Sequence, residues 1–124
     1  MDQHEQLVKG VAEQFKEVLE KSSQGIYLYL DDTHKICNKQ FADLLGYISP
    51  EQWASTEAPL ADVVEGDRPA VVRAYRAAVG KFKATKLSVK FHNVSTHRSF
   101  TRRMTVVPLP FQGSIFSAHF IDKT

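Results

Sequence analysis

Apolar residues recur at helical spacing along the first twenty residues of the chain. The resulting stripe consists of Leu7, Val11, Phe15, Val18 and Leu19, with charged residues between its members. This period predicts an amphipathic helix that ends near Ser22. Because an apolar stripe in water is unfavourable by about 25 cal/mol per Å², we expect the helix to cover a sheet or to pair with a second copy.

The period changes to two after Gly25. Ile26, Leu28 and Leu30 alternate with two tyrosines, so the pattern predicts a strand that is covered on both faces. Asp31 and Asp32 supply turn chemistry, and the segment 35–37 is a second short strand. The pattern therefore predicts a β-hairpin.

Three helix starts follow in the middle of the chain. Asn38 is placed as the N-cap of a helix that Gly46 ends, and Ser49, Pro50 and Gln52 form a capping box for a short second helix. Asp67 is the expected cap of a third helix, which ends at Gly80. We expect the core face of this third helix to be Val71, Val72, Tyr75 and Val79, with Arg73 and Arg76 in water.

Alternating patterns return near the C-terminus. They predict strands over 86–91, 100–107 and 114–121, joined by turns at 93–99 and 108–113. One helix, two strands, several short helices and three strands indicate an α+β fold. We expect one five-stranded antiparallel sheet with short helices on one face and a pocket between them.

Composition narrows the class of protein. The 124 residues are 43% hydrophobic, which suits one domain of the usual size of about 100 to 150 residues. The formal net charge is +2, and no apolar run approaches the roughly 18 residues that suggest a membrane span. The single cysteine, Cys37, cannot form an intramolecular disulfide. These features predict a cytoplasmic protein without a membrane anchor.

Three segments, in the right order, resemble the PAS domain family. Residues 36–47 resemble its strand-to-helix box, with the asparagine cap and the closing Leu-Gly-Tyr, and residues 64–69 are similar to its acidic turn, without the usual His-Pro pair. Residues 120–124 resemble the closing Asp-x-Thr signature. The resemblance implies an N-terminal capping or dimerisation helix over 1–23 and a PAS-like domain over 24–124.

What the resemblance implies is a sensory or interaction module, often dimeric, that sometimes holds haem, flavin or a small metabolite. Cys37 lies too early in the chain for the reactive cysteine of a flavin photosensor, and the segment 68–79 has no histidine for haem. The five histidines are His4, His34, His92, His97 and His119, and they lack the spacing of metal ligands. His119, in an apolar strand, is expected to be satisfied by a hydrogen bond rather than to act as a pH switch. No metal site is predicted, and the cofactor stays open.

The family register places a ligand site on the helix-covered face of the sheet. The residues expected to line it are Leu28, Leu30, Phe91, Met104, Val106, Phe116 and Phe120, with Ile26 and Ala118 on the same face. Arg102 shares the alternation of Met104, so its guanidinium either pairs with an anionic ligand or turns to solvent. Asn93 is a second candidate polar contact.

A basic stretch around Arg98, Arg102 and Arg103, with lysines at 81, 83, 86 and 90, raises the alternative of nucleic-acid binding. Alternation puts only about half of these residues on one face, so we expect a solvated sheet edge and no nucleic acid. The expected partners are a second copy, bound through the N-terminal helix and the sheet face, and a small ligand.

Two functions fit this pattern. The first is a non-enzymatic sensory module that binds a small ligand or a protein partner and dimerises. The alternative is a small pocket enzyme of the cone-shaped isomerase or dehydratase type, which needs a buried acid or base. The candidate carboxylates for it, Asp31, Asp32, Asp43 and Asp62, are expected in turns or on solvated helix faces.

Overall fold

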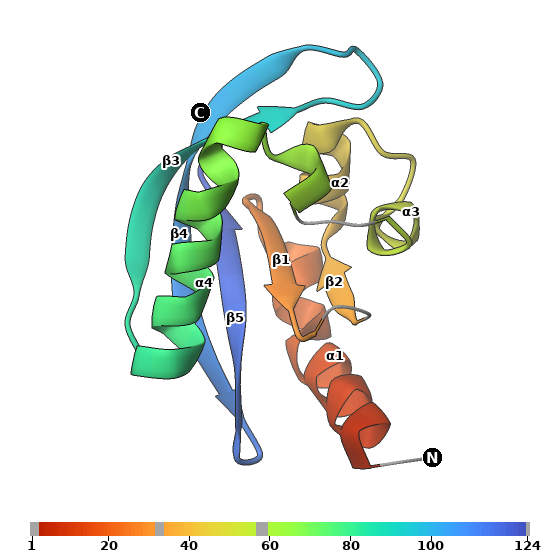
Figure 1. Ribbon diagram of the computed structural model, residues 1–124. Coiled ribbons are helices and arrows are strands. Elements are labelled where there is room, and N and C mark those ends of the chain that lie inside the picture. The colour runs from red at the N-terminus through yellow and green to blue at the C-terminus, as the bar shows by residue number, and fades with distance from the viewer. Residues whose placement is uncertain (1–2, 32–33, 57–59, 124) are drawn as a thin grey trace.

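The computed structural model describes residues 3–31, 34–56 and 60–123 (Figure 1). Helices and strands follow in the order α1 (Gln3–Lys21), β1 (Gly25–Tyr29), β2 (Lys35–Cys37), α2 (Lys39–Leu45), α3 (Pro50–Ala54), the 3₁₀ turns η1 (Leu60–Asp62) and η2 (Glu65–Asp67), α4 (Arg68–Lys81), β3 (Thr85–His92), β4 (Ser99–Phe111) and β5 (Ser114–Ile121). Asp32, Thr124 and the side chain of His4 lie outside the described residues.

The five strands form one antiparallel sheet, as the sequence predicts. Their order is β2-β1-β5-β4-β3, so the first and last parts of the chain meet where β1 pairs with β5. Helices α2, α3 and α4 pack on one face of the sheet (Figure 1). Helix α1 packs on the opposite face, where Val11 and Leu19 are buried against Leu28 and Phe116. The predicted apolar stripe therefore covers the sheet.

Two of the predicted helix starts have the expected capping geometry. The Asn38 side chain accepts from Phe41 N at the start of α2, and Gly46 ends that helix with a φ of 87°. A Cβ at Gly46 would also overlap Asn93 Oδ1, so two constraints favour glycine there. Ser49 Oγ accepts from Gln52 N at the start of α3.

Helix α4 differs from its prediction at both ends. Asp67 makes no side-chain cap, because its carboxylate accepts from Lys90 N at 2.8 Å and joins the helix to β3. The helix continues through Gly80 to Lys81, and Phe82 follows in the left-handed region with a φ of 53°. Its buried face consists of Val71, Ala74 and Ala78, while Val72, Tyr75 and Val79 are half-buried.

Strand β4 is longer than the sequence predicts. The segment 108–111, expected in a turn, pairs with β5 as far as Phe111, and the turn is confined to Gln112 and Gly113. Prolines are tolerated because β3 pairs with β4 only up to Val106, so the other side of β4 is open at Pro108 and Pro110. Among the described residues, no helix is long and apolar enough to cross a membrane.

Candidate functional site

Polar side chains, all buried except the half-buried Tyr47, gather between the sheet and helices α2 and α3. We call this group the Tyr27 cluster, and its members are Tyr27, Tyr47, Trp53, Asp62, Ser117 and His119. Apolar residues of the sheet and of α4 surround it. Polar groups at this depth are costly unless they are hydrogen-bonded, so each one needs an explanation.

Tyr27 lies at the centre of the cluster. Its ring stacks on His119 with the centroids 4.1 Å apart, and the Trp53 ring centroid is 5.4 Å away. The Tyr27 hydroxyl donates to Met104 Sδ at 3.7 Å, a weak acceptor. Burial and the nearby charge of Asp62 raise the pKa of Tyr27, so the phenol keeps its proton.

His119 is neutral in this setting. One ring nitrogen, Nε2, lies 2.8 Å from Ser117 Oγ, which confirms the expected hydrogen bond within the sheet. Burial lowers the pKa of His119 to about 3. The histidine therefore carries no charge at neutral pH.

Asp62 is the one buried carboxylate among the described residues, with 2% of its surface exposed. Tyr47 donates to its Oδ1 at 2.6 Å. Burial raises the pKa of Asp62, and the Tyr47 hydroxyl and the Trp53 indole lower it in part. This placement corrects the expectation that Asp62 lies in a turn or on a solvated helix face.

Three atoms of the Tyr27 cluster have no hydrogen-bond partner among the described residues. They are Trp53 Nε1, Asp62 Oδ2 and His119 Nδ1. The Trp53 indole is near enough to affect the Asp62 carboxylate, but forms no bond of ordinary geometry with it. An unsatisfied buried polar atom costs about 1–3 kcal/mol. These atoms are one donor, one acceptor and one ring nitrogen.

Asn38 joins four segments next to this cluster. Its Oδ1 accepts from Ile26 N and Phe41 N, each at 3.0 Å, which connects β1 and α2. Its Nδ2 donates to Leu19 O at 3.2 Å and to Gln24 O at 2.8 Å, which holds the end of α1. One buried side chain thus links α1 to the helix that carries Phe41 into the core.

The structure brings together three of the nine residues that the sequence proposes as a ligand site. Phe91, Met104 and Val106 are buried on the helix-covered face with the Tyr27 cluster. Their role in binding stays a prediction.

Four other proposed residues lie on the wrong face for that site. The four residues Leu28, Leu30, Phe116 and Phe120 pack against α1. Tyr27 and His119 lie on the opposite face, which α2, α3 and α4 cover. Ile26 and Ala118 lie with these four on the α1 side. Strand β1 is apolar on both faces, so its alternation does not reveal which set faces which helices.

Arg102 and Asn93 make local contacts. Arg102 has its Cζ 5.1 Å from the centroid of the Phe100 ring, and its Nη1 donates to Thr101 O at 3.1 Å. Asn93 orders the turn after β3, because its Oδ1 accepts from Ser95 N and Thr96 N while Nδ2 donates to Leu44 O. Neither contact involves the Tyr27 cluster.

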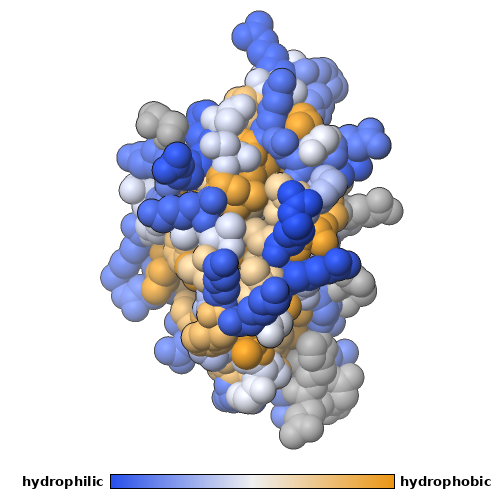
Figure 2. All heavy atoms as spheres, turned by 60° about the vertical axis from the view of Figure 1, so that its left-hand side comes forward, coloured by the Kyte–Doolittle hydropathy of each residue, from blue (hydrophilic) through white to orange (hydrophobic). Residues whose placement is uncertain are grey.

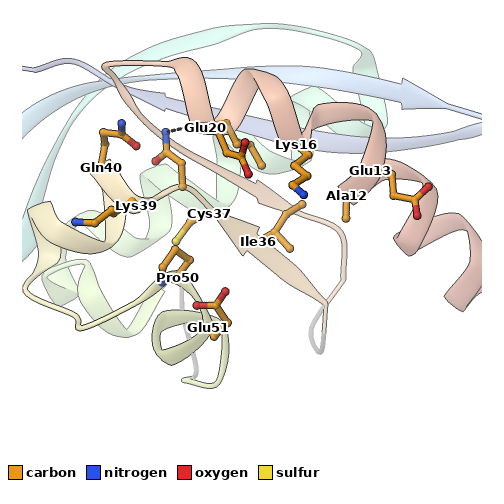
Figure 3. A pocket seen from close by; sticks show the side chains of 12 residues that line it. Ala12, Glu13, Lys16, Glu20, Ile36, Cys37, Lys39, Gln40, Pro50 and Glu51 are labelled. Carbon is orange, nitrogen blue, oxygen red and sulfur yellow. Dashed lines mark hydrogen bonds between the residues drawn. The ribbon is translucent and has the colours of Figure 1, made fainter.

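A groove of about 550 Å³ lies beside the edge strand β2 (Figure 3). Side chains of α1 and α3 face each other across Ile36 and Cys37, and Lys39 and Gln40 lie at one end. Burial raises the pKa of the Cys37 thiol to about 12, so this cysteine is a buried filler without thiolate character. The groove mixes acidic, basic and apolar residues and includes none of the nine proposed ones.

Sequence reasoning missed most of the Tyr27 cluster. Tyr27 and Tyr29 interrupt an otherwise aliphatic strand, and a tyrosine in such a position usually needs a partner for its hydroxyl. That was the available signal for Tyr27. No sequence signal identifies Asp62, because only the fold brings η1 over the sheet. Among the described residues, no group of three or more His, Cys, Asp or Glu side chains is arranged to hold a metal ion.

Comparison with known proteins gives the fold. No protein-family model and no curated protein matches the sequence. A PAS domain from a two-component sensor histidine kinase matches with a TM-score of 0.66 at 16% identity, over 94% of this chain and 99% of that chain.

Two further solved structures agree. The PAS domain of an HTR-like protein from Haloarcula marismortui has a TM-score of 0.65 at 14% identity, over 95% of both chains. A PAS domain from Colwellia psychrerythraea has a TM-score of 0.68 at 16% identity, over 92% of this chain and 97% of that chain. The resemblance read from the sequence is thus confirmed for the fold.

Proposed function

We propose, starting from the PAS fold that this chain adopts, that the protein is a sensory module whose Tyr27 cluster binds a small polar ligand. The observation that carries the proposal is a set of three buried polar atoms, Trp53 Nε1, Asp62 Oδ2 and His119 Nδ1, which have no hydrogen-bond partner in residues 3–31, 34–56 and 60–123. A ligand that forms hydrogen bonds with these atoms removes the cost of leaving them buried and unsatisfied.

The chemistry of these atoms indicates the class of ligand. Asp62 offers an acceptor and the Trp53 indole a donor, so the ligand carries an O–H or N–H group beside an acceptor. A buried carboxylate repels an anion, so a neutral or cationic alcohol, amide or amine fits best. An anionic ligand held by Arg102 is the other proposal. For it, Arg102→Ala should abolish ligand retention with little loss of thermal stability.

The proposed route of the signal begins with repacking. Tyr27, Trp53, Asp62 and His119 are each at most 2% exposed, so a ligand enters only if the cluster opens. Opening displaces α2 or α3, and Asn38 links α2 directly to the end of α1. Ligand binding thereby changes how firmly α1 is held on the sheet.

The test is native mass spectrometry of freshly purified protein, together with Trp fluorescence. Trp53 is the single tryptophan and lies inside the cluster, so its emission reports binding there. We expect a retained small molecule, or a shift in emission on titration with a panel of small alcohols, amides and amines. Asp62→Asn should weaken binding, whereas Asp43→Asn, on the exposed side of α2, should not. A protein that binds nothing in either assay refutes the proposal.

Two accompanying features belong to the same proposal. We expect a homodimer that forms through the outer side of α1 and the adjoining sheet face, where Val18 is 52% exposed. We also expect a cytosolic location, for which the support is a single, buried cysteine.

The second candidate function is an acid–base enzyme, and the buried Asp62–Tyr47 pair favours it. A carboxylate with a raised pKa in an apolar interior is a common general base. The two functions differ in the fate of the bound molecule. A sensor returns its ligand unchanged, whereas conversion to a product of new mass or of new chromatographic retention that Asp62→Asn abolishes would favour the enzyme.

A further inference from the structure

The small net charge hides a strong separation of charge along the chain. Residues 68–121 contain ten Lys and Arg and no Asp or Glu. The first 67 residues contain thirteen of the fourteen acidic residues and only five Lys and Arg. Charge is therefore sorted by segment, and the fold decides whether it is also sorted in space.

The fold gathers the basic segment on one side of the molecule. Residues 68–121 form α4, β3, β4 and β5, and the first three of these lie together on the left of Figure 1. Their exposed Lys and Arg residues are Arg73, Arg76, Lys81, Lys83, Lys86, Lys90, Arg98 and Arg103. Lys86, Lys90 and Arg103 lie on the sheet face opposite α4, so Arg73 and Arg76 form a separate basic surface with Lys81 and Lys83, which stand at the end of that helix.

In the described residues, these cations have no acidic partner from the same chain. Within the described part of the chain, none of the eight forms an ion pair, whereas Lys21 pairs with Glu17 and Lys39 with Asp43 on the other side. The nearest acidic element is η2, whose Glu65 lines a hollow on α4 with Arg68, Arg73 and Arg76. Arg73 and Arg76, three positions apart on α4, are neighbours on the helix surface, so their positive fields reinforce each other.

Apolar surface lies among the charges. Figure 2, which brings this side forward, shows apolar residues gathered in the middle and hydrophilic side chains across and around them. Phe82 is 59% exposed between Lys81 and Lys83, and its φ of 53° is unusual for an aromatic residue. Val72, beside Arg73 on α4, is half-buried.

We propose that the exposed side of α4, from Arg73 to Lys83, docks an acidic, amphipathic segment of a partner protein. Carboxylates of the segment pair with Arg73 and Arg76, since a guanidinium can bind a carboxylate through two hydrogen bonds. Its apolar residues cover Phe82 and Val72. A protein fits better than a nucleic acid duplex, because the acidic excess in the first 67 residues opposes a long polyanion, and a duplex keeps its bases paired and offers no apolar side chain to cover Phe82. The inference names a partner for the proposed sensory module but does not need the ligand site.

The experiment is a fluorescence-anisotropy titration with a labelled helical peptide of Glu and Leu residues. Arg73→Glu/Arg76→Glu should weaken binding by roughly tenfold or more. The matched control, Lys9→Glu/Lys16→Glu on α1, makes the same change in net charge and should stay within about twofold. Phe82→Gly should also weaken binding, while the glycine suits the left-handed backbone and preserves the fold.

Several outcomes would overturn the inference. They are no binding of the peptide, equal weakening by the two charge-reversed variants, and tighter binding of duplex DNA than of the peptide. Trp53 emission should be the same in all variants. If the peptide does not bind while the Tyr27 cluster still binds its ligand, the docking inference is wrong and the proposed sensory function stands.

Discussion

At the scale of single residues, burial shifts the pKa values of His119 and Asp62 in opposite directions. The pKa of His119 is lowered to about 3, while the pKa of Asp62 is raised. Both shifts favour the neutral form of the side chain. Each therefore contributes to a pH dependence of folding with its own sign.

His119 should make the protein less stable in acid. Between pH 6.5, the ordinary pKa of histidine, and about pH 3, His119 is protonated in the unfolded chain and neutral in the folded protein. The free energy of unfolding should fall as pH falls through this window, by at most about 1.4 kcal/mol per pH unit. Denaturant unfolding of wild type and His119→Gln at several pH values measures it, and parallel curves would contradict the prediction. A Ser117→Ala/His119→Phe variant checks that the missing slope does not come from an unpartnered Ser117.

Asp62 should act in the opposite sense. Because the pKa of Asp62 is raised in the folded protein, its contribution to the free energy of unfolding is complete below the ordinary value of about 3.9. This contribution is lost as pH rises through the folded pKa. The stability of Asp62→Asn relative to wild type should therefore increase with pH across that range. Tyr47→Phe removes a hydrogen bond that lowers this pKa, so the loss should move to higher pH. A pH-independent difference between Asp62→Asn and wild type would exclude a raised pKa.

At the scale of elements, helix α1 is held by one side chain at its C-terminal end. Asn38→Asp keeps the oxygen that accepts from Ile26 N and Phe41 N but loses both donations to Leu19 O and Gln24 O. The variant should release the end of α1 while the sheet stays folded. Hydrogen exchange should then accelerate in α1 and change little in β5.

The matched variant Asn38→Ala loses all four bonds and should destabilise the whole domain by about 1–3 kcal/mol or more. If Asn38→Asp exchanges like the wild type in α1, Asn38 does not secure that helix.

The elements show where sequence patterns were sufficient. Caps and stops are local, so Asn38, Ser49 and Gly46 were predictable from their neighbours alone. Asp67 was not, because its carboxylate binds Lys90 N, which is 23 positions away. The faces of β1 and β5 were not predictable either, because helices cover both sides of these strands. When both faces are apolar, alternation does not show which set of residues faces α1 and which faces α2–α4. The prediction of the candidate site is wrong for the same reason: Tyr27 and His119 lie on the face where Leu28 and Phe116 are expected from the sequence.

At the scale of the whole molecule, α1 covers only part of the outer sheet face. Val18 is 52% exposed on α1, and Phe15 is half-buried beside it. If the protein dimerises through this surface, Val18→Glu should shift sedimentation towards the monomer, because it places a charge in an apolar interface. Ile48→Glu changes an apolar residue that is 87% exposed elsewhere and should leave the dimer intact. A wild-type protein that sediments as a monomer at all concentrations would refute the dimer.

The whole molecule also explains why counting charges was not enough. A net charge of +2 suggested no electrostatic role, yet residues 68–121 lack any acidic side chain. Alternation along β3 and β4 does split Lys and Arg between two faces, as the sequence indicates. Helix α4 adds Arg73 and Arg76 over the face that Val89 and Phe91 occupy, and only the fold shows that α4 lies together with β3 and β4.

The long hairpin of β4 and β5 carries protection against aggregation. Beyond Val106 the outer edge of β4 has no neighbouring strand, and an open edge is a template on which another chain can add a strand. Pro108 and Pro110 offer that template no backbone N–H at two alternate positions. The same two residues that the sequence pattern assigns to a turn thus hinder strand addition at this exposed edge, which lowers the tendency of the protein to form fibrils at high concentration.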